Sequence, residues 1–269
     1  YMSGAPVSGK TRGFLMALIF IMFVPRMLAL GVFLIDDIIR LFKYLFSWLN
    51  SSAEVQINSS GISRSKFLQL TGLSVFGVFL SAFTYGVFKG GYNYKVLKRK
   101  LKIANLPKQF EGLKIVQISD LHVGSFFSIK PLEEAIEIIN QQKADLIFFT
   151  GDLVNEVSEE AVPFVPVLKK MKANLGVYSI LGNHDYGDYF YDKNSPDVIE
   201  KKKHNKDLMK SIHEQSGFNL LLDESVQLER GGEEISIIGV ENWGAKARFP
   251  KYGKLHKAVK GTEKSKVKL

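Results

Sequence analysis

Two carboxylates, two imidazoles and an amide stand at spacings that would suit metal-dependent hydrolysis. Asp120 and His122 are one residue apart, Asp152 follows Asp120 by 32 positions, and Asn183 and His184 come 31 and 32 positions after Asp152. Carboxylate, imidazole and amide-oxygen donors together favour Mn, Fe or Zn over copper or an all-oxygen calcium site. Such ions can activate a bound water as a nucleophile.

Each of these polar clusters directly follows a short apolar run that predicts a strand. The runs cover residues 113–119, 145–150 and 176–181. Apolar residues at helical spacing lie between them, first after Pro131 and then from Phe164 to Met171, so the order is strand, helix, strand, helix, strand. This order predicts an α/β fold. Because ligands bind at the carboxyl ends of strands in open α/β sheets, we expect the three clusters to converge.

Local geometry supports this convergence. Asp120 and His122 alternate with Leu121, so an extended backbone would direct both side chains to the same side. Gly151 and Gly182 would allow tight turns at the strand ends. Taken singly, each residue also has a structural interpretation: a helix-capping or turn aspartate, a core histidine, or an asparagine in an ordinary turn.

The downstream sequence predicts further alternating elements. A third helix should end near Gln215, with Gly217 as its stop. Strands are predicted at 218–222, 226–229 and 234–240, the last two joined by a turn at 230–232. Trp243, which follows the last strand, is interpreted as a packed aromatic residue.

The three motifs together resemble a known family. Asp-x-His at 120–122, Gly-Asp at 151–152 and Gly-Asn-His-Asp at 182–185, in this order, are similar to the calcineurin-like metallophosphoesterases. The resemblance covers about residues 112–245 and implies a layered β-sandwich flanked by helices. The apolar N-terminal region resembles the membrane-associated bacterial branch, whose enzymes cleave phospholipid headgroups or UDP-2,3-diacylglucosamine.

The resemblance also implies a role for each motif residue. It implies two divalent metal ions, with Asp120 and His122 on the first, Asp152 bridging both and Asn183 on the second. His184 would face the phosphate, where it stabilises charge or protonates the leaving oxygen, and Asp185 would orient the His184 imidazole.

The sequence departs from the family in one respect. The downstream Gly-His and Gly-His-x-His motifs are absent, and the remaining histidines, His204, His213 and His256, are interpreted as surface residues. The chain starts at Tyr1 and ends in a strand-like segment, so we interpret it as truncated at both ends. If truncated in this way, the chain would bind metal weakly or hydrolyse nothing.

The N-terminal region predicts attachment to a membrane. Transmembrane helices are expected at 14–35 and 67–88, an amphipathic continuation at 36–49 and a polar loop at 51–60. The first span has an interfacial helical hairpin as its alternative. Two basic residues precede the second span and six follow it, which favours a cytoplasmic C-terminal region at the cell membrane. The predicted organisation is a membrane region (1–89), a linker (90–111) and a partial phosphoesterase domain (112–269).

Composition limits the classes of partner. Of the 36 Lys and Arg residues, 14 lie in residues 1–109 beside only three acidic residues, so the net charge of +9 belongs to the apolar region. This placement favours membrane lipids over nucleic acid as a partner. The absence of cysteine excludes disulfides and Cys-ligated zinc. We expect a phosphodiesterase acting on a phosphoester, lipid-linked or soluble; the alternative is a non-catalytic, membrane-anchored phosphate- or partner-binding protein.

Overall fold

The computed structural model describes residues 9–49, 63–245, 249–265 and 267–269, and its contacts divide the chain into two units that meet at Lys95 and Val96. Its regular elements are α1 (Gly9–Leu49), α2 (Arg64–Phe88), η1 (Gly90–Tyr92), η2 (Lys108–Phe110), β1 (Ile115–Ile118), η3 (Val123–Ser125), α3 (Lys130–Gln141), β2 (Leu146–Phe149), η4 (Ser158–Phe164), α4 (Val165–Leu168), β3 (Val177–Ser179), α5 (Val198–Gln215), β4 (Asn219–Leu220), β5 (Glu224–Arg230), β6 (Glu233–Gly239) and α6 (Leu255–Ala258).

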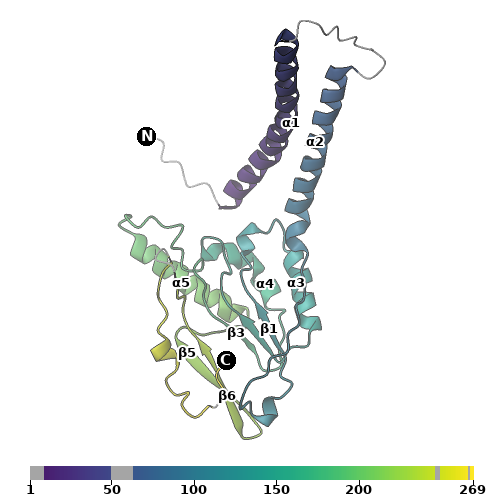
Figure 1. The fold of residues 1–269 in the computed structure, drawn as a ribbon. Helices are drawn as coiled ribbons and strands as arrows, with labels where there is room; N and C mark the ends of the chain where they lie inside the picture. The colour runs from purple at the N-terminus through teal and green to yellow at the C-terminus, as the bar shows by residue number, and fades with distance from the viewer. Residues whose placement is uncertain (1–8, 50–62, 246–248, 266) are drawn as a thin grey trace. The chain divides into compact units, whose positions relative to one another are not determined.

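Two long apolar helices, α1 and α2, are the main elements of the first unit and pack against each other (Figure 1). Both are long and apolar enough to cross a membrane. The expected span 14–35 and the amphipathic segment 36–49 form one continuous helix through Pro25. At about 1.5 Å per residue this helix is roughly 60 Å long, about twice the hydrocarbon core of a bilayer. The loop expected at 51–60 lies outside the described residues.

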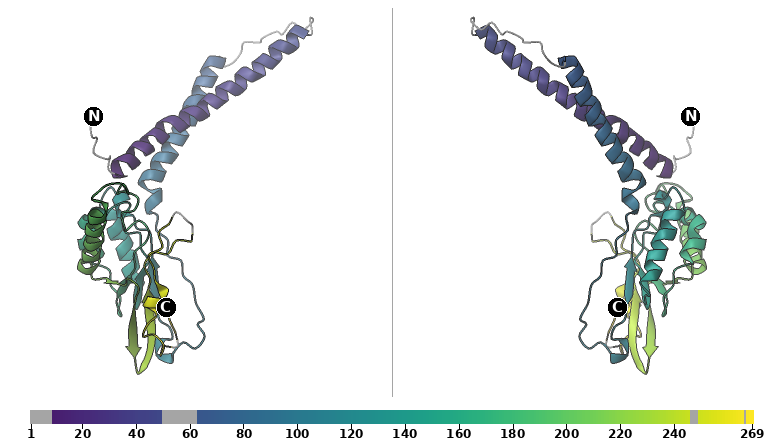
Figure 2. Two further views of the ribbon diagram at one scale, coloured as in Figure 1. Left: turned by 90° about the vertical axis from the view of Figure 1, so that its left-hand side faces the viewer. Right: turned by 90° about the vertical axis from the view of Figure 1, so that its right-hand side faces the viewer.

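The second unit is built on a parallel sheet in the order β1-β2-β3-β4. Strand β2 is paired on both sides and buried on both faces, which accounts for its continuous apolar sequence. On one face Phe149 stacks on His213 of α5, and on the other Leu146 and Phe148 pack with Ile237 of β6. Figure 2 shows α3 and α5 on one side of the sheet and the β5–β6 hairpin on the other. The layered arrangement of helices and sheets expected from the sequence is therefore confirmed.

The second layer consists of the antiparallel pair β5 and β6. Gly231 and Gly232 form the turn between them with φ values of 57° and 77°, as a type I′ hairpin turn requires. The last residues of the chain run beside β6: the Ser236 amide donates to the Val267 carbonyl (3.1 Å), and the Leu269 amide donates to the Ser236 carbonyl (2.8 Å). The predicted turn at 230–232 is confirmed.

One predicted helix is largely replaced by another conformation. Phe164, Leu168 and Met171 are buried as expected, but the chain forms the 3₁₀ segment η4 and only the short helix α4. Pro163 and Pro166 lack the N–H groups that a longer α-helix would use, which explains the difference. Helices α3 and α5 form where periodicity predicted them, and α5 ends at Gln215 before Gly217.

Candidate metal centre

The loops that follow β1, β2 and β3 meet at one edge of the parallel sheet. The Asp120 amide donates to the Gly151 carbonyl (3.0 Å), and the His122 amide donates to the Asp152 carbonyl (3.1 Å). The His184 amide donates to Oδ1 of Asp152 (2.9 Å). Hydrogen bonds therefore join all three motif-bearing loops, as parallel strand order predicts.

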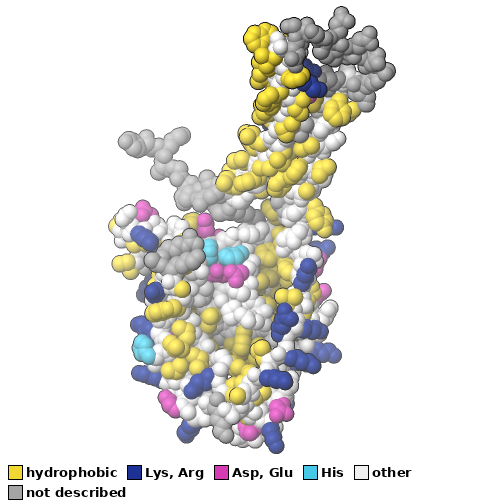
Figure 3. Space-filling model, viewed as in Figure 1, with side chains coloured by type: hydrophobic (Ala, Val, Ile, Leu, Met, Phe, Trp, Pro, Cys, Tyr) yellow, Lys and Arg dark blue, Asp and Glu magenta, His cyan; other side chains and the backbone are white. Residues whose placement is uncertain are grey.

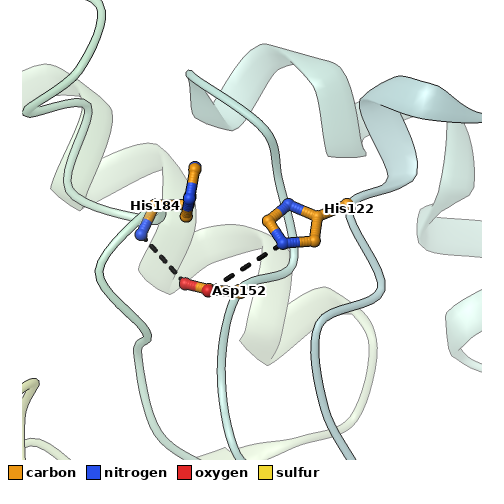
Figure 4. A group of neighbouring side chains, drawn as sticks. All are labelled: His122, Asp152 and His184. Carbon is orange, nitrogen blue, oxygen red and sulfur yellow. Dashed lines mark hydrogen bonds and ion pairs between the residues drawn. The ribbon is translucent and has the colours of Figure 1, made fainter.

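Three side chains form a compact group of metal-binding type: His122, Asp152 and His184 (Figure 4). One ligand atom from each lies within 4.8 Å of the others. Nε2 of His122 is 3.9 Å from Oδ2 of Asp152, and the two imidazole rings meet edge to face at 4.8 Å. Figure 3 shows histidine and acidic side chains side by side on the visible face of this unit. The side chain of His122 is 30% exposed and that of Asp152 is 13% exposed.

Main-chain carbonyl groups hold both imidazole rings through Nδ1. Nδ1 of His122 is 3.0 Å from the Val154 carbonyl oxygen, and Nδ1 of His184 is 2.6 Å from the Asn155 carbonyl oxygen. A carbonyl oxygen only accepts hydrogen bonds, so each Nδ1 carries a proton and each neutral ring has its lone pair on Nε2. This second-shell arrangement is the usual one for histidines that bind metal.

Three of the predicted ligands have left-handed backbone conformations: Asp120, His122 and Asp152, with φ values of 55°, 45° and 57°. Such residues cost about 1–3 kcal/mol each and cluster at functional sites. The predicted extended backbone at Asp120 and His122 is therefore wrong. The hydrogen bonds to Gly151 and Asp152 impose the left-handed turns, and the two side chains still approach, with 3.8 Å between Asp120 Oδ1 and His122 Nε2.

Gly151 and Gly182 let the second and third loops approach closely. A Cβ on Gly151 would lie 2.6 Å from the Gly182 Cα, and a Cβ on Gly182 would lie 2.5 Å from the Asp152 amide nitrogen. Gly151 also has a positive φ of 93°. As predicted, glycine is needed at both turns. Gly151 is needed for its positive φ and for space, and Gly182 is needed for space alone.

Asp185 is fully buried. The sequence predicts that it orients the His184 ring, but the Asn155 carbonyl occupies the Nδ1 position of that ring. Its carboxylate accepts hydrogen bonds from the amides of Asp152, Leu153 and Gly182 at 2.8–2.9 Å. Burial raises the pKa of Asp185 to about 7, with a further contribution from the nearby Asp152 charge. The predicted orientation of His184 by Asp185 is corrected: Asp185 positions the loop whose Asn155 carbonyl holds that ring.

The other two predicted ligands lie at the margin of the group. Asp120 has a largely exposed side chain (64%), and its Oδ2 accepts a hydrogen bond from Ser119. Asn183 precedes His184, and its Nδ2 donates to the Tyr189 hydroxyl at 3.0 Å. The structure thus brings His122, Asp152 and His184 together, with Asp120 and Asn183 beside them.

Sequence reasoning missed the groups that support this site. Glu160 accepts a hydrogen bond from the Asn155 amide (2.6 Å), and burial raises the pKa of its carboxyl group. The ring of Tyr189 is 4.7 Å from the His184 ring. Residue types do not reveal which backbone carbonyls, here those of Val154 and Asn155, accept hydrogen bonds. A tyrosine five positions after a candidate histidine is the one signal in the sequence that points to Tyr189.

The remaining histidines are divided between surface and core. His204 and His256 are exposed, as predicted. His213 was predicted at the surface and is wholly buried, because α5 turns that side toward the sheet. Its ring lies between Phe149 and Phe218, with Nδ1 2.8 Å from Ser179 Oγ, and burial lowers its pKa to about 4. Trp243, predicted to be packed, is 63% exposed.

Two protein-family models match parts of this chain. Residues 113–258 match the model described as "Calcineurin-like phosphoesterase". The chain belongs to the calcineurin-like phosphoesterase family. Residues 2–91 match a second model, "Probable Calcineurin-like phosphoesterase, transmembrane domain", which agrees with the two apolar helices and indicates membrane association.

Three curated relatives illustrate the range of this family. The chain is 35% identical over 140 residues to the uncharacterized metallophosphoesterase YkuE of Bacillus subtilis (48% of this chain, 46% of YkuE). It is 29% identical over 166 residues to a transmembrane protein with metallophosphoesterase domain of Danio rerio (58% and 36%). It is 39% identical over 89 residues to the UDP-2,3-diacylglucosamine pyrophosphatase LpxG of Chlamydia trachomatis (32% and 27%). The chain spans less than half the length of each.

The donor set fits the divalent metal ions that metallophosphoesterases use. Asp152 supplies a carboxylate and His122 a lone pair on Nε2, 3.9 Å apart, and the Val154 carbonyl at His122 Nδ1 is the usual partner of a metal-bound imidazole. Mixed nitrogen and oxygen donors suit first-row transition ions.

Proposed function

We propose that this chain carries the metal-binding part of a membrane-anchored hydrolase of phosphoester bonds. The observation that carries the proposal is the convergence of His122, Asp152 and His184 at the carboxyl ends of the parallel strands. In this proposal residues 1–89 anchor the chain, residues 90–111 link the two parts and residues 112–269 form the phosphoesterase region.

The proposed centre holds two ions, each Mn, Fe or Zn. Asp120 and His122 would bind one ion, Asn183 would bind the other, and Asp152 would be shared. Such ions, when bound, neutralise charge on the phosphoryl oxygens and allow water to act as a nucleophile near neutral pH. The protein's part is orientation: Val154 and Asn155 fix the two rings, and the buried Asp185 fixes the loop between them.

His184 has a second proposed task at the phosphate. With Nδ1–H held by the Asn155 carbonyl, only Nε2 can exchange a proton with a bound substrate. In its protonated form the ring would donate from Nε2 to the leaving oxygen and stabilise its charge. General acid catalysis of this kind contributes about 10²–10⁴-fold.

The proposed substrate is a lipid-linked phosphodiester or pyrophosphate at the cell membrane. Membrane association supports this choice, and LpxG, named a UDP-2,3-diacylglucosamine pyrophosphatase, is one of the relatives. Two basic residues precede α2's apolar stretch and six follow it within residues 89–102, which supports a cytoplasmic phosphoesterase region near anionic lipids.

The test is hydrolysis of bis-p-nitrophenyl phosphate and of a lipid panel by the full chain in nanodiscs with Mn²⁺. The panel contains UDP-2,3-diacylglucosamine and common phospholipids. Asp152→Asn and His184→Ala should each lower the rate at least about 100-fold. His204→Ala, at an exposed histidine away from the motifs, is the matched control.

Mn²⁺ binding without hydrolysis of any substrate would favour the alternative, a phosphate- or partner-binding membrane protein. Equal Mn²⁺ binding by the parent and Asp152→Asn would refute the metal centre itself.

A further inference from the structure

An exposed tyrosine contacts two neighbouring residues of the proposed site. Tyr189 Oη accepts a hydrogen bond from Nδ2 of Asn183 (3.0 Å), and its ring lies 4.7 Å from the His184 ring at an interplanar angle of 44°. The side chain is nevertheless 47% exposed. Tyr189 therefore adds little as a core residue, and its contacts are directed at the site.

The Asn183 amide has two chemically different ends. Its oxygen has lone pairs for a cation, whereas its nitrogen carries two hydrogens and serves only as a donor. Rotation of the amide by 180° would turn the NH₂ group toward the cation and repel it. With Nδ2 directed at Tyr189, Oδ1 lies at the opposite end of the amide.

The hydroxyl of Tyr189 can donate as well as accept, so it would also tolerate the rotated amide. A cation on Oδ1 removes this ambiguity, because Nδ2 then faces the phenol and requires an acceptor. The hydrogen bond and the metal–oxygen contact thus reinforce each other. Removing the hydroxyl should weaken metal binding without removing a ligand.

The loop that carries Tyr189 is fixed by other contacts. The preceding residue, Asp188, pairs with Lys202 (2.6 Å) and accepts a hydrogen bond from Tyr252 (2.8 Å). The Tyr191 amide donates back to the Gly187 carbonyl (3.1 Å). These contacts hold the loop without the Tyr189 hydroxyl, so the phenol oxygen is a preset acceptor for Asn183.

We infer that Tyr189 is a positioning residue that holds the Asn183 amide with its oxygen toward the metal centre. The inference rests on the proposed function, because it takes Asn183 as a metal ligand. It extends that function by giving a residue outside the three motifs the task of orienting a metal ligand.

The test is a Mn²⁺ titration of the full chain in nanodiscs, in which the electron paramagnetic resonance signal of free Mn²⁺ reports how much has bound. Tyr189→Phe should lower the Mn²⁺ affinity of the position that Asn183 binds by about 10-fold, the lower end of the range for losing a residue that orients a ligand. The ion that no longer binds in Asn183→Ala is the one that depends on Asn183. Tyr191→Phe removes a nearby tyrosine hydroxyl that has no described contact with Asn183 or His184, and it should bind Mn²⁺ like the parent.

Steady-state kinetics separate positioning from general damage. For Tyr189→Phe, the Mn²⁺ concentration giving half-maximal rate should rise about 10-fold, while kcat at saturating Mn²⁺ stays within about 2-fold of the parent. A lower kcat at every Mn²⁺ concentration would assign Tyr189 to structure or chemistry and overturn the inference. Unchanged Mn²⁺ affinity in Tyr189→Phe, or in Asn183→Ala, would also overturn it.

The two hypotheses fail in different ways. If Asp152→Asn abolishes Mn²⁺ binding and Tyr189→Phe leaves it unchanged, the metal centre stands and only the role of Tyr189 falls. If Asp152→Asn leaves binding unchanged, the proposed function and the inference fall together.

Discussion

Burial of His213 should make the phosphoesterase unit less stable in mild acid. The ring lies between Phe149 and Phe218 and is wholly buried, with Ser179 Oγ on Nδ1 and no partner on Nε2 within the described residues. A neutral histidine suits these surroundings, and burial lowers its pKa from 6.5 to about 4. The unfolded chain therefore takes up this proton at a higher pH than the folded chain.

The sign and size follow from this difference. Between pH 6.5 and 4 the unfolded state binds more protons, so stability falls as pH falls, and the contribution is fully present above pH 6.5. Each pKa unit corresponds to about 1.4 kcal/mol, which gives a loss of about 3 kcal/mol across this window. Below pH 4 the contribution of His213 to the slope ends.

Hydrogen exchange of the α5 amides, corrected for intrinsic exchange rates, would measure this effect. The comparison is between the parent and His213→Leu combined with Ser179→Ala, which removes the titrating ring and its hydroxyl partner together. We expect the protection free energy of α5 to fall by about 3 kcal/mol more in the parent than in the double variant between pH 6.5 and 4. Equal slopes in the two proteins would refute the reasoning.

Two further predictions concern the loops of the metal centre. Gly182→Ala places a Cβ against the Asp152 amide and should cost about 1–3 kcal/mol of stability together with most Mn²⁺ binding, measured by thermal unfolding and metal titration. Gly217→Ala, whose new Cβ meets nothing within 4 Å but whose φ of 76° strains an alanine, should lose some stability and keep its Mn²⁺ affinity. Asp185→Asn puts an NH₂ group where a carboxylate oxygen accepts hydrogen bonds from buried amides, so thermal unfolding should show a loss of about 1–3 kcal/mol, and unchanged stability would contradict this role.

Much of the second unit follows from patterns in the sequence. The apolar runs before Asp120, Asp152 and Asn183 each form a strand of one parallel sheet; β2 and β3 are buried as such runs predict, whereas β1 at the sheet edge is partly exposed. Convergence of the clusters then follows from topology alone, since parallel strands end at the same edge. The periodicities of α3 and α5 were equally informative, because each helix buries one continuous side.

Other features were beyond sequence patterns for physical reasons. The left-handed turns at Asp120 and His122 arise from hydrogen bonds to another loop, and local sequence does not encode distant partners. His213 was misplaced because polar neighbours on α5 obscured its buried side. The role of Asp185 was misassigned because a carboxylate after a histidine suggests a pair, whereas folding directs it to backbone amides.

The groups that hold the two imidazole rings of this centre belong to the main chain. From Asp152 to Asn155 the backbone N–H groups donate to the carboxylates of Asp185 and Glu160, and the carbonyl groups of the last two residues, Val154 and Asn155, accept from the two rings. The chemical identity of side chains 154 and 155 is therefore irrelevant to tautomer control, and relatives can diverge there without altering the imidazoles. What must be conserved is the course of the main chain from residue 152 to residue 155, which a comparison of side-chain identities does not reveal.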